Sequence, residues 1–395
     1  MNEAVLVVEG GTQIGLEIIR SLGKENVLVY SAGPGKIQLS FYSKYISKKF
    51  ILPFSPEERF IERLFYILKK NPEIKYLIAI SERNITVLNK YRSELQKYVK
   101  PLFPPQEIME YALNRRKTNE VAQKLGIPIP QTIFIDHFED IEKAKNIPYP
   151  VITKPATRDF HHPLQSKLDF RVKYFSSYPQ LKKHMETFKE ANWFPMVQVC
   201  CNGEETGFAI IMARGKPVVC FQYLNMHLSP VKGGVPVLRE SIPINPEIKT
   251  YSIELLKAIK WEGVAEIDYI RDHRDGQFKL LEINGRFWGG TPLPSRAGLP
   301  FPYLLYRALA KEEDFYTENY KIGIKCRLLG GDTTRFLEIL KSSNQLSISK
   351  WQAIKEYISL FFDPSVKYDV QTLDDPLPGI MDIWFMIKKV FGFLI

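Results

Sequence analysis

Two acidic residues and an amide occupy neighbouring predicted strands, where they could share one cation. In Leu281-Glu282-Ile283-Asn284, Glu282 and Asn284 alternate with apolar residues, so they lie on the same face of a strand. Asp268 belongs to the preceding apolar segment, and a hairpin between the two segments brings it beside Glu282. These oxygens suit Mg²⁺, which often shares its ligands with nucleotide phosphates. The alternative is an exposed polar strand face held by salt bridges.

Basic residues at the ends of two predicted elements could contact phosphate groups. Lys154 ends an apolar strand predicted at 151–155, where its ammonium could meet a phosphate as a point charge. A solvated surface lysine is the alternative. Arg115, Arg116 and Lys117 begin a predicted helix, where positive charge opposes the helix macrodipole. That arrangement indicates that an anion binds nearby.

The first hundred residues predict a parallel sheet. Residues 4–8 are a short apolar run, which we interpret as a buried first strand rather than a signal peptide. Gly10, Gly11 and Gly15 then turn the chain into a helix over 16–22 that ends at Gly23, and a strand follows. Strand, turn, helix and strand are the opening of an α/β sheet. The glycines do not follow G-x-G-x-x-G, so a structural turn is favoured over a dinucleotide site.

Beyond the prolines at 101–105 the pattern changes to antiparallel hairpins, one at 208–223 and one at 263–283. We therefore predict an α/β unit followed by an α+β unit. The predicted boundaries are an N-terminal parallel-sheet domain at 1–105, a central domain of two α+β subdomains at 106–305 with a lid at about 150–205, and a small helical C-terminal extension at 306–395.

Composition limits the classes of function. The 395 residues are 45% hydrophobic with a formal charge of +10, which fits a folded multidomain chain. Such charge could attract nucleic acid, anionic lipid or phosphorylated ligands. No nucleic-acid motif is present, so we expect a solvated basic surface and no nucleic-acid partner. The four cysteines form no C-x-x-C pair, and no apolar run approaches a membrane span. We expect a cytoplasmic protein in a reducing compartment.

The last residues predict an amphipathic helix at 380–395. Asp382, Lys388, Lys389 and Gly392 fall on one arc at helical spacing. A helix docked on the core, peripheral contact with a membrane and a homodimer contact are the three alternatives.

Four segments, in this order, resemble the motifs of the ATP-grasp superfamily, and the resemblance covers roughly residues 1–305. They are Asn114-Arg115 through Gly126-Ile127-Pro128-Ile129-Pro130 (similar to "DK…GIPxP"), Val151–Pro155 ("VxKP"), Gln198–Gly203 with Glu204-Glu205 ("QEYxxGxE"), and Asp268 with Glu282-Ile283-Asn284-Gly285-Arg286 ("D…ExNxR"). The carboxylate–amine ligases of that superfamily, such as those similar to the carbamoyl-phosphate synthase large chain or to D-alanine–D-alanine ligase, are the nearest subset.

The resemblance implies ATP and Mg²⁺, or Mn²⁺, as cofactors, and a small carboxylate and an amine as substrates. The carboxylate would attack the γ-phosphate, and an amine or thiol would then displace phosphate. The implied roles are phosphate binding by Arg115 and Lys154, adenine binding by Gln198, Val199, Cys200 and Cys201, ribose binding by Glu205, metal binding by Asp268, Glu282 and Asn284, and catalysis by Arg286 with Lys154.

The sequence departs from the family pattern after Lys154. A glycine-rich lid is expected there, but the chain reads Ala156–Pro163 without a glycine. We expect a solvated loop. The alternative is that basic residues cover the phosphates instead, namely Arg158, His161, His162 and Lys167. Val199-Cys200 also replaces the usual hinge acid, and Asn114-Arg115 replaces the Asp-Lys pair.

Three other functions remain open. The irregular lid would suit an ATP-binding regulator or scaffold without turnover. A kinase of the same fold would phosphorylate a hydroxyl, and a dinucleotide oxidoreductase would use the first domain. For a ligase, we expect the acceptor pocket at Arg286, Trp288 and the loop at 232–239.

Overall fold

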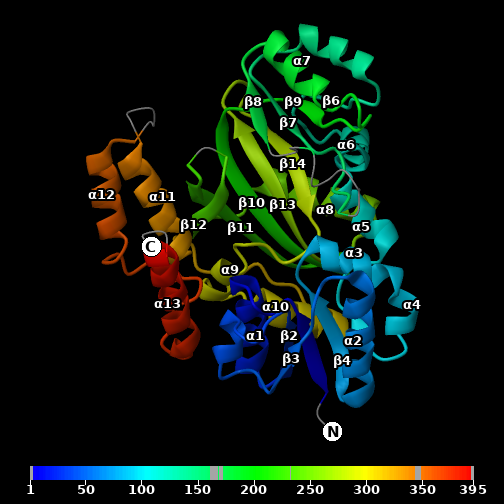
Figure 1. Cartoon of the computed structure of the whole chain (residues 1–395), viewed down its shortest axis with the longest axis vertical. Coiled ribbons are helices and arrows are strands. Elements are labelled where there is room, and N and C mark those ends of the chain that lie inside the picture. The colour runs from blue at the N-terminus through cyan, green and yellow to red at the C-terminus, as the bar shows by residue number, and fades with distance from the viewer. Residues whose placement is uncertain (1–2, 161–167, 169–171, 232, 343–347, 393–395) are drawn as a thin grey trace.

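The computed structural model describes residues 3–160, 168, 172–231, 233–342 and 348–392. Three sheets follow one another in space (Figure 1). The N-terminal sheet lies at one end, a large curved sheet occupies the centre, and a small sheet with its helices lies at the other end. The C-terminal helices pack along one side of the large sheet.

The N-terminal sheet is parallel throughout, with strand order β3-β2-β1-β4-β5, so the predicted opening is confirmed. Thr12 caps α1, and a Cβ on Gly15 would lie 2.5 Å from the Gly10 backbone, so the glycine turn is tight. The helix does not end at Gly23 but continues to Lys24. The elements are β1 (Ala4–Val8), α1 (Gln13–Lys24), β2 (Leu28–Gly33), η1 (Leu39–Tyr42), β3 (Lys48–Ile51), α2 (Glu57–Lys70), β4 (Ile74–Ala79), α3 (Glu82–Lys90), α4 (Arg92–Leu95) and β5 (Lys100–Pro101).

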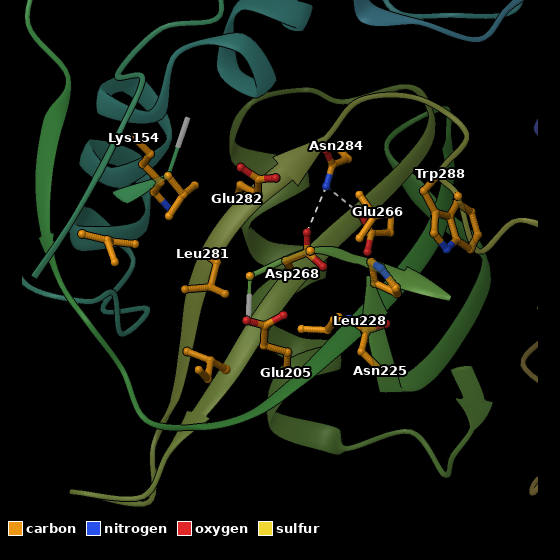
Figure 2. Close-up of a pocket in the computed structure, with 18 of the residues that line it drawn as sticks. Lys154, Glu205, Asn225, Leu228, Glu266, Asp268, Leu281, Glu282, Asn284 and Trp288 are labelled. Atoms are coloured by element: carbon orange, nitrogen blue, oxygen red, sulfur yellow. Dashed lines mark hydrogen bonds between the residues drawn. The ribbon is translucent and has the colours of Figure 1, made fainter. Parts of the chain in front are cut away.

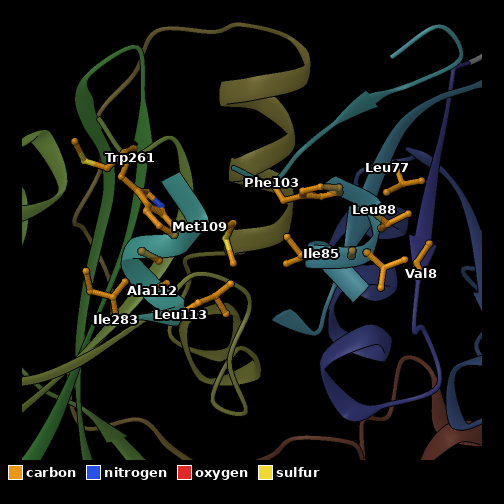
Figure 3. Close-up of a cluster of buried hydrophobic side chains, with 14 of the residues drawn as sticks. Val8, Leu77, Ile85, Leu88, Phe103, Met109, Ala112, Leu113, Trp261 and Ile283 are labelled. Carbon is orange, nitrogen blue, oxygen red and sulfur yellow. The ribbon is translucent and has the colours of Figure 1, made fainter. Parts of the chain in front are cut away.

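Two helices, α5 (Gln106–Leu113) and α6 (Arg115–Lys124), connect this sheet to the rest of the chain. Met109 and Leu113 of α5 lie between Trp261 on one side and Phe103 and Ile85 on the other (Figure 3). All five side chains belong to one buried apolar cluster, so the N-terminal sheet and the large sheet share a core. Burial of this kind is the main stabilising contribution to the fold.

The small sheet has the order β6-β9-β7-β8 and is antiparallel. Its apolar face packs under α7, and Leu181 of that helix is fully buried. The elements are β6 (Thr132–Ile133), η2 (Phe138–Asn146), β7 (Val151–Lys154), β8 (Lys173–Phe175), α7 (Tyr178–Glu186) and β9 (Met196–Val199).

The large sheet has the order β14-β13-β10-β11-β12-β15-β16. Both predicted hairpins are present, and Asp268 pairs directly with Glu282 across β13 and β14. The strands are β10 (Gly203–Ala213), β11 (Lys216–Ser229), β12 (Val235–Ser241), β13 (Gly263–Asp272), β14 (Phe278–Asn284), β15 (Lys325–Arg327) and β16 (Val366–Tyr368). The helices of this part are α8 (Pro246–Ala258), α9 (Pro292–Arg296), α10 (Phe301–Leu305) and η3 (Tyr306–Ala310).

The C-terminal extension was predicted to be helical, but it contains strands as well as helices. It contributes α11 (Leu329–Lys341), α12 (Lys350–Ser359) and α13 (Pro376–Gly392), but also the strands β15 and β16 of the large sheet. Buried ion pairs fasten it to the rest of the chain. Arg20 Nε lies 2.9 Å from Asp375 Oδ2, and Arg239 Nη2 lies 2.6 Å from Asp369 Oδ2.

The helix predicted at the C-terminus is present as α13, but the predicted arrangement of its polar residues is wrong. Asp382 is half-buried and accepts a hydrogen bond from Gln371 at 2.9 Å, so it faces the protein and does not share a solvent face with the exposed Lys388. Ile380 and Trp384 are instead 58% and 50% exposed. No helix in the described part of the chain is long and apolar enough to span a membrane.

Candidate active site

A pocket of about 560 Å³ lies between the small sheet and the large sheet. Lys154 and Gln198 reach it from the small sheet, while Asp268 and Glu282 reach it from the large sheet. Lys154 and Glu282 stand toward one end of the pocket and Trp288 at the other (Figure 2). This volume is within the range of small-molecule sites, about 300–1,000 Å³.

The three predicted metal ligands all line this pocket. Asn284 Nδ2 donates to Asp268 Oδ2 at 3.0 Å and to Glu266 Oε2 at 2.7 Å (Figure 2). Asp268 stands beside Glu282 in the strand register, as predicted. Glu266 was missed, although its position two residues before Asp268 places it on the same strand face.

Electrostatics at this cluster favour a cation. Burial and the carboxylates of Glu266 and Glu282 raise the pKa of Asp268 well above its ordinary value. Within the described residues, no group of three or more His, Cys, Asp or Glu side chains has the arrangement of a ready-made metal site. Asp268, Glu282 and Asn284 nevertheless bring side-chain oxygens to the pocket, and Mg²⁺ often takes its other ligands from substrate phosphates and water.

Glu282 is surrounded by cations. Arg115 Nη2 donates to Glu282 Oε2, and Arg158 Nη2 donates to Glu282 Oε1 at 2.8 Å. Burial alone would raise the pKa of Glu282, but Arg115, Arg158 and Lys154 hold it below its ordinary value. Arg115 and Lys154, the two residues predicted to bind phosphate, therefore both lie beside Glu282, a predicted metal ligand.

Lys154 is 8% exposed at the end of β7. Burial, together with the positive charge of Arg115, lowers the pKa of its ammonium to about 8. An anion bound beside it would favour the charged form. The solvated-lysine alternative is therefore wrong.

Arg158 was expected in a solvated loop, and the structure contradicts this. Its side chain is 18% exposed, and Nη1 lies 2.6 Å from Glu82 Oε2 while Nη2 holds Glu282. Glu82 begins α3 of the N-terminal part, and nothing near it in the sequence marks it as a site residue. The other basic residues of this loop, His161, His162 and Lys167, lie outside the described residues.

The predicted adenine-binding segment also lines the pocket, from Gln198 to Cys201, with Glu205 nearby. Gln198 Nε2 donates to Thr132 Oγ1 at 2.8 Å, which fixes β9 against β6. Burial raises the pKa of the Cys201 thiol to about 11, so it carries a proton at neutral pH and is a poor nucleophile. This wall of the pocket is suited to binding rather than to covalent chemistry.

Arg286 and Trp288 follow β14 and line the pocket, and their role on an acceptor side stays a prediction. Arg286 Nη2 donates to Asn284 Oδ1 at 3.1 Å, which ties it to the carboxylate cluster. Trp288 stacks on Tyr223 with ring centroids 6.2 Å apart, and the Tyr223 hydroxyl donates to Glu266 Oε1 at 2.6 Å. Tyr223 was missed because its strand reads as ordinary buried sheet.

The sequence is related, at a distance, to curated ligases. No family model matches the chain. It is 22% identical over 267 residues to D-aspartate ligase of Enterococcus faecium, an alignment covering 62% of each chain. It is 24% identical over 337 residues to a carbamoyl phosphate synthase large chain of Thermoanaerobacter pseudethanolicus, covering 77% of this chain and 28% of that one. The alignments thus span less than two thirds of these relatives.

Solved structures share the fold. The biotin carboxylase domain of 2-oxoglutarate carboxylase from Hydrogenobacter thermophilus, a dimer solved with MgADP, ADP and bicarbonate, superposes with a TM-score of 0.63. It is 14% identical and the match covers 82% of this chain and 73% of that one. L-amino acid ligase from Bacillus licheniformis gives 0.61 at 14% identity, covering 78% and 74%. The predicted resemblance to the ATP-grasp superfamily is confirmed at the level of fold, and the predicted cofactors agree with the ligands of the first structure.

Proposed function

We propose that this chain is an ADP-forming ligase that uses Mg-ATP to activate a carboxylate for attack by an amine. One observation carries the proposal. Arg115, Arg158 and Lys154 surround Glu282, which stands beside Asp268 in a pocket between two sheets. The similarity to ligases in sequence and fold supports the reaction class.

The residues present fit Mg²⁺, and Mn²⁺ takes similar ligands. Asp268, Glu282 and Asn284 would hold it, with Glu266 next to them. A divalent cation relieves the repulsion that raises the pKa of Asp268. When bound, the metal neutralises charge on the phosphates during transfer. Glu282 would exchange one of its arginine contacts for the metal.

The chain's own residues would act mainly by position and charge. An oxygen of the substrate carboxylate attacks the γ-phosphorus, the bond to ADP breaks, and an acyl phosphate forms. An amine then attacks the acyl carbon, phosphate leaves with the bonding electrons, and the nitrogen gives up a proton. Lys154 and Arg115 would bind the phosphates, and Arg286 would stabilise the transferred group.

Release of ADP tests the proposal. The full chain is incubated with Mg-ATP, hydroxylamine and pools of amino acids, small carboxylates and sugar acids. We expect one pool to stimulate ADP release together with hydroxamate formation, and Glu282→Gln to abolish both. Stable phosphorylated product that needs no amine would instead identify a kinase. Absence of nucleotide binding would refute the ATP-grasp function altogether.

A nucleotide-binding regulator without turnover is the second candidate, and the ion pairs favour it. Both oxygens of Glu282 already accept hydrogen bonds from arginines, which would weaken a metal site. Titration of the full chain with ATP, with and without Mg²⁺, separates the two. Affinity that is unchanged by Mg²⁺, with no turnover in any pool, would favour the regulator.

The predicted partners beyond small molecules remain proposals. A homodimer would match the dimeric biotin carboxylase structure. Peripheral membrane contact would use the exposed face of α13, which includes Ile380 and Trp384. Flotation with anionic liposomes tests this contact, and equal flotation of the full chain and of Trp384→Asp would refute it.

A further inference from the structure

A buried histidine joins two of the C-terminal helices to the large sheet. The helices α11 and α12 lie side by side at one side of that sheet (Figure 1). His227 belongs to β11, and each of its ring nitrogens meets a carboxylate. Nδ1 lies 2.8 Å from Asp332 Oδ1 of α11, and Nε2 lies 2.9 Å from Glu356 Oε1 of α12. One imidazole ring therefore connects β11 to both helices.

Both contacts require the charged form of the ring. An ionised carboxylate only accepts hydrogen bonds, and a neutral imidazole has a single N–H, so only the imidazolium can donate to Asp332 and Glu356 at once. Leu238, which pairs with His227 across β12, adds no charge. Burial and the charge of Arg335 favour the neutral ring. The two carboxylates outweigh both and raise the pKa of His227 above its ordinary value.

The carboxylates themselves stay ionised, because each lies near a second cation. Asp332 Oδ2 lies 2.7 Å from Arg327 Nε of β15, and Glu356 Oε2 lies 3.6 Å from Arg335 Nη1 of α11. Burial would raise the pKa of Asp332, but His227 and Arg327 lower it. The hydrogen bond from His227 also lowers the pKa of Glu356. The proton that this cluster loses as the pH rises is therefore the one on His227.

The helix α12 has few other contacts with the large sheet. Of its ten residues only Ala353 is buried, and the buried Leu360 follows directly after them. The helix packs mainly on α11, where Tyr357 stacks on Phe336 with ring centroids 4.3 Å apart. Because little apolar surface is buried, the contact of Glu356 with His227 is a large part of what holds α12 to the sheet.

We propose that His227, Asp332 and Glu356 form a pH-sensitive clasp, which holds α12 on the large sheet while the ring is charged and releases it when the ring becomes neutral. Asp332 is buried and keeps Arg327 as a partner in both states, so it retains the remaining N–H of the ring. The side chain of Glu356 is 42% exposed and can turn to water, so its contact is the one that breaks.

The clasp adjoins one wall of the pocket. Leu228 follows His227 in β11 and Leu328 follows Arg327 of β15, and both leucines line the pocket. Because the pKa of His227 is raised in the folded chain, the clasp stabilises the docked helix fully below about pH 6.5, the ordinary pKa of histidine. That stabilisation is lost as the pH rises through the raised value. The helix α12 is therefore expected to loosen at alkaline pH.

Hydrogen exchange tests the clasp. The full chain is exchanged at about pH 6 and about pH 9.5, and the protection of peptides from α12 is corrected for the intrinsic effect of pH on exchange. We expect the protection of α12 to fall at least about tenfold between the two, which is the effect of losing one charge-assisted hydrogen bond. Peptides from β1 in the N-terminal sheet should keep their protection.

Two variants separate a clasp from a contact that is only structural. His227→Gln does not titrate, and its amide can donate to one carboxylate only, so α12 should be weakly protected at both pH values. Glu356→Gln can accept a hydrogen bond from the charged ring and donate one to the neutral ring, so α12 should stay protected at both. His273→Gln changes an exposed histidine of the β13–β14 turn and is the matched control, which should behave like the wild type.

The clasp is refuted if the protection of α12 in the wild type does not change with pH, or if Glu356→Gln loses protection as the wild type does. An equal loss throughout the chain would mean general unfolding and would refute it too. If His227→Gln does not fold, the wild type and Glu356→Gln still decide the question. None of these measurements requires a nucleotide or a substrate, so their outcome is independent of the proposed ligase function.

Discussion

The two ends of the pocket are built in different ways. At the Lys154 end, cations crowd a shared carboxylate, since Arg115 and Arg158 both hold Glu282. At the Trp288 end, the charge of Arg239 is cancelled by Asp369, and buried donors and acceptors remain free. The first end is suited to a highly charged ligand and the second to a less charged one. A transferred phosphoryl group would pass between them, at Asp268 and Asn284.

The ends also differ in where their support comes from. Arg115, Lys154 and Glu282 belong to the central part of the chain. Arg239 depends on Asp369, which lies 130 residues later in the C-terminal extension, and Leu328 of the same region lines the pocket. The difference implies that the extension supports the Trp288 end, the proposed acceptor end, more than the Lys154 end, the proposed nucleotide end.

The largest effect is expected at the nucleotide end. Lys154→Ala should lower kcat/KM for ATP by about 10²–10³, because a buried cation aimed at the phosphates is lost. Steady-state ADP release measures this. Lys216→Ala, an exposed lysine at the start of β11, is the matched control. Comparable rates for Lys154→Ala and wild type would remove Lys154 from the site.

The second-largest effect is expected for Asp369→Asn, which should lower stability and weaken acceptor binding. Asp369→Asn leaves Arg239 buried without its counter-charge, which should lower the free energy of unfolding by about 3 kcal/mol. Urea unfolding measures the loss. Asp363→Asn, whose partner Lys325 is more exposed, should cost less than about 1 kcal/mol. In the folded protein, Asp369→Asn should weaken acceptor binding more than ATP binding. A larger loss of ATP binding would contradict the inference that Asp369 supports mainly the Trp288 end.

A smaller effect is expected for Arg158→Met. This change removes the bridge between Glu82 and Glu282 and keeps most of the side-chain volume. ATP affinity should fall about tenfold, because a cation that lines the pocket beside Lys154 and Arg115 is lost. Fluorescence titration with an ATP analogue measures it. Tighter Mg²⁺ binding in the variant would show that Arg158 competes with the metal for Glu282. An unchanged affinity for both ligands would make Arg158 a structural residue only.

The smallest effect is a pH dependence at Lys154. The pKa of its ammonium is about 8 in the free chain, and bound phosphates favour the charged form, so nucleotide binding takes up a proton. ATP affinity should therefore fall about fourfold between pH 7 and pH 8.5 by linkage. Calorimetry in two buffers of different ionisation enthalpy measures the proton uptake. Lys154→Arg does not titrate in this range and should show a flatter profile.

The sequence predicts local geometry well and long-range pairing poorly. Period-two alternation and one hairpin were enough to place Asp268, Glu282 and Asn284 together. Arg158 was misjudged because its partners, Glu82 and Glu282, lie 76 and 124 residues away. The pairing of Arg239 with Asp369 has no local signal either, since it depends on β15 and β16 joining the large sheet. The helix α13 was found, but which of its faces meets the protein depends on tertiary contacts.

In the proposed reaction a substrate carboxylate, and not water or a hydroxyl, attacks the γ-phosphate of ATP. The carboxylate that stimulates ADP release is labelled with ¹⁸O in both oxygens and incubated with Mg-ATP and hydroxylamine, and the inorganic phosphate is analysed by mass spectrometry. The proposed mechanism predicts one ¹⁸O atom in each phosphate released. Unlabelled phosphate would mean simple ATP hydrolysis, and ADP release without phosphate would mean a kinase; either result would contradict carboxylate activation.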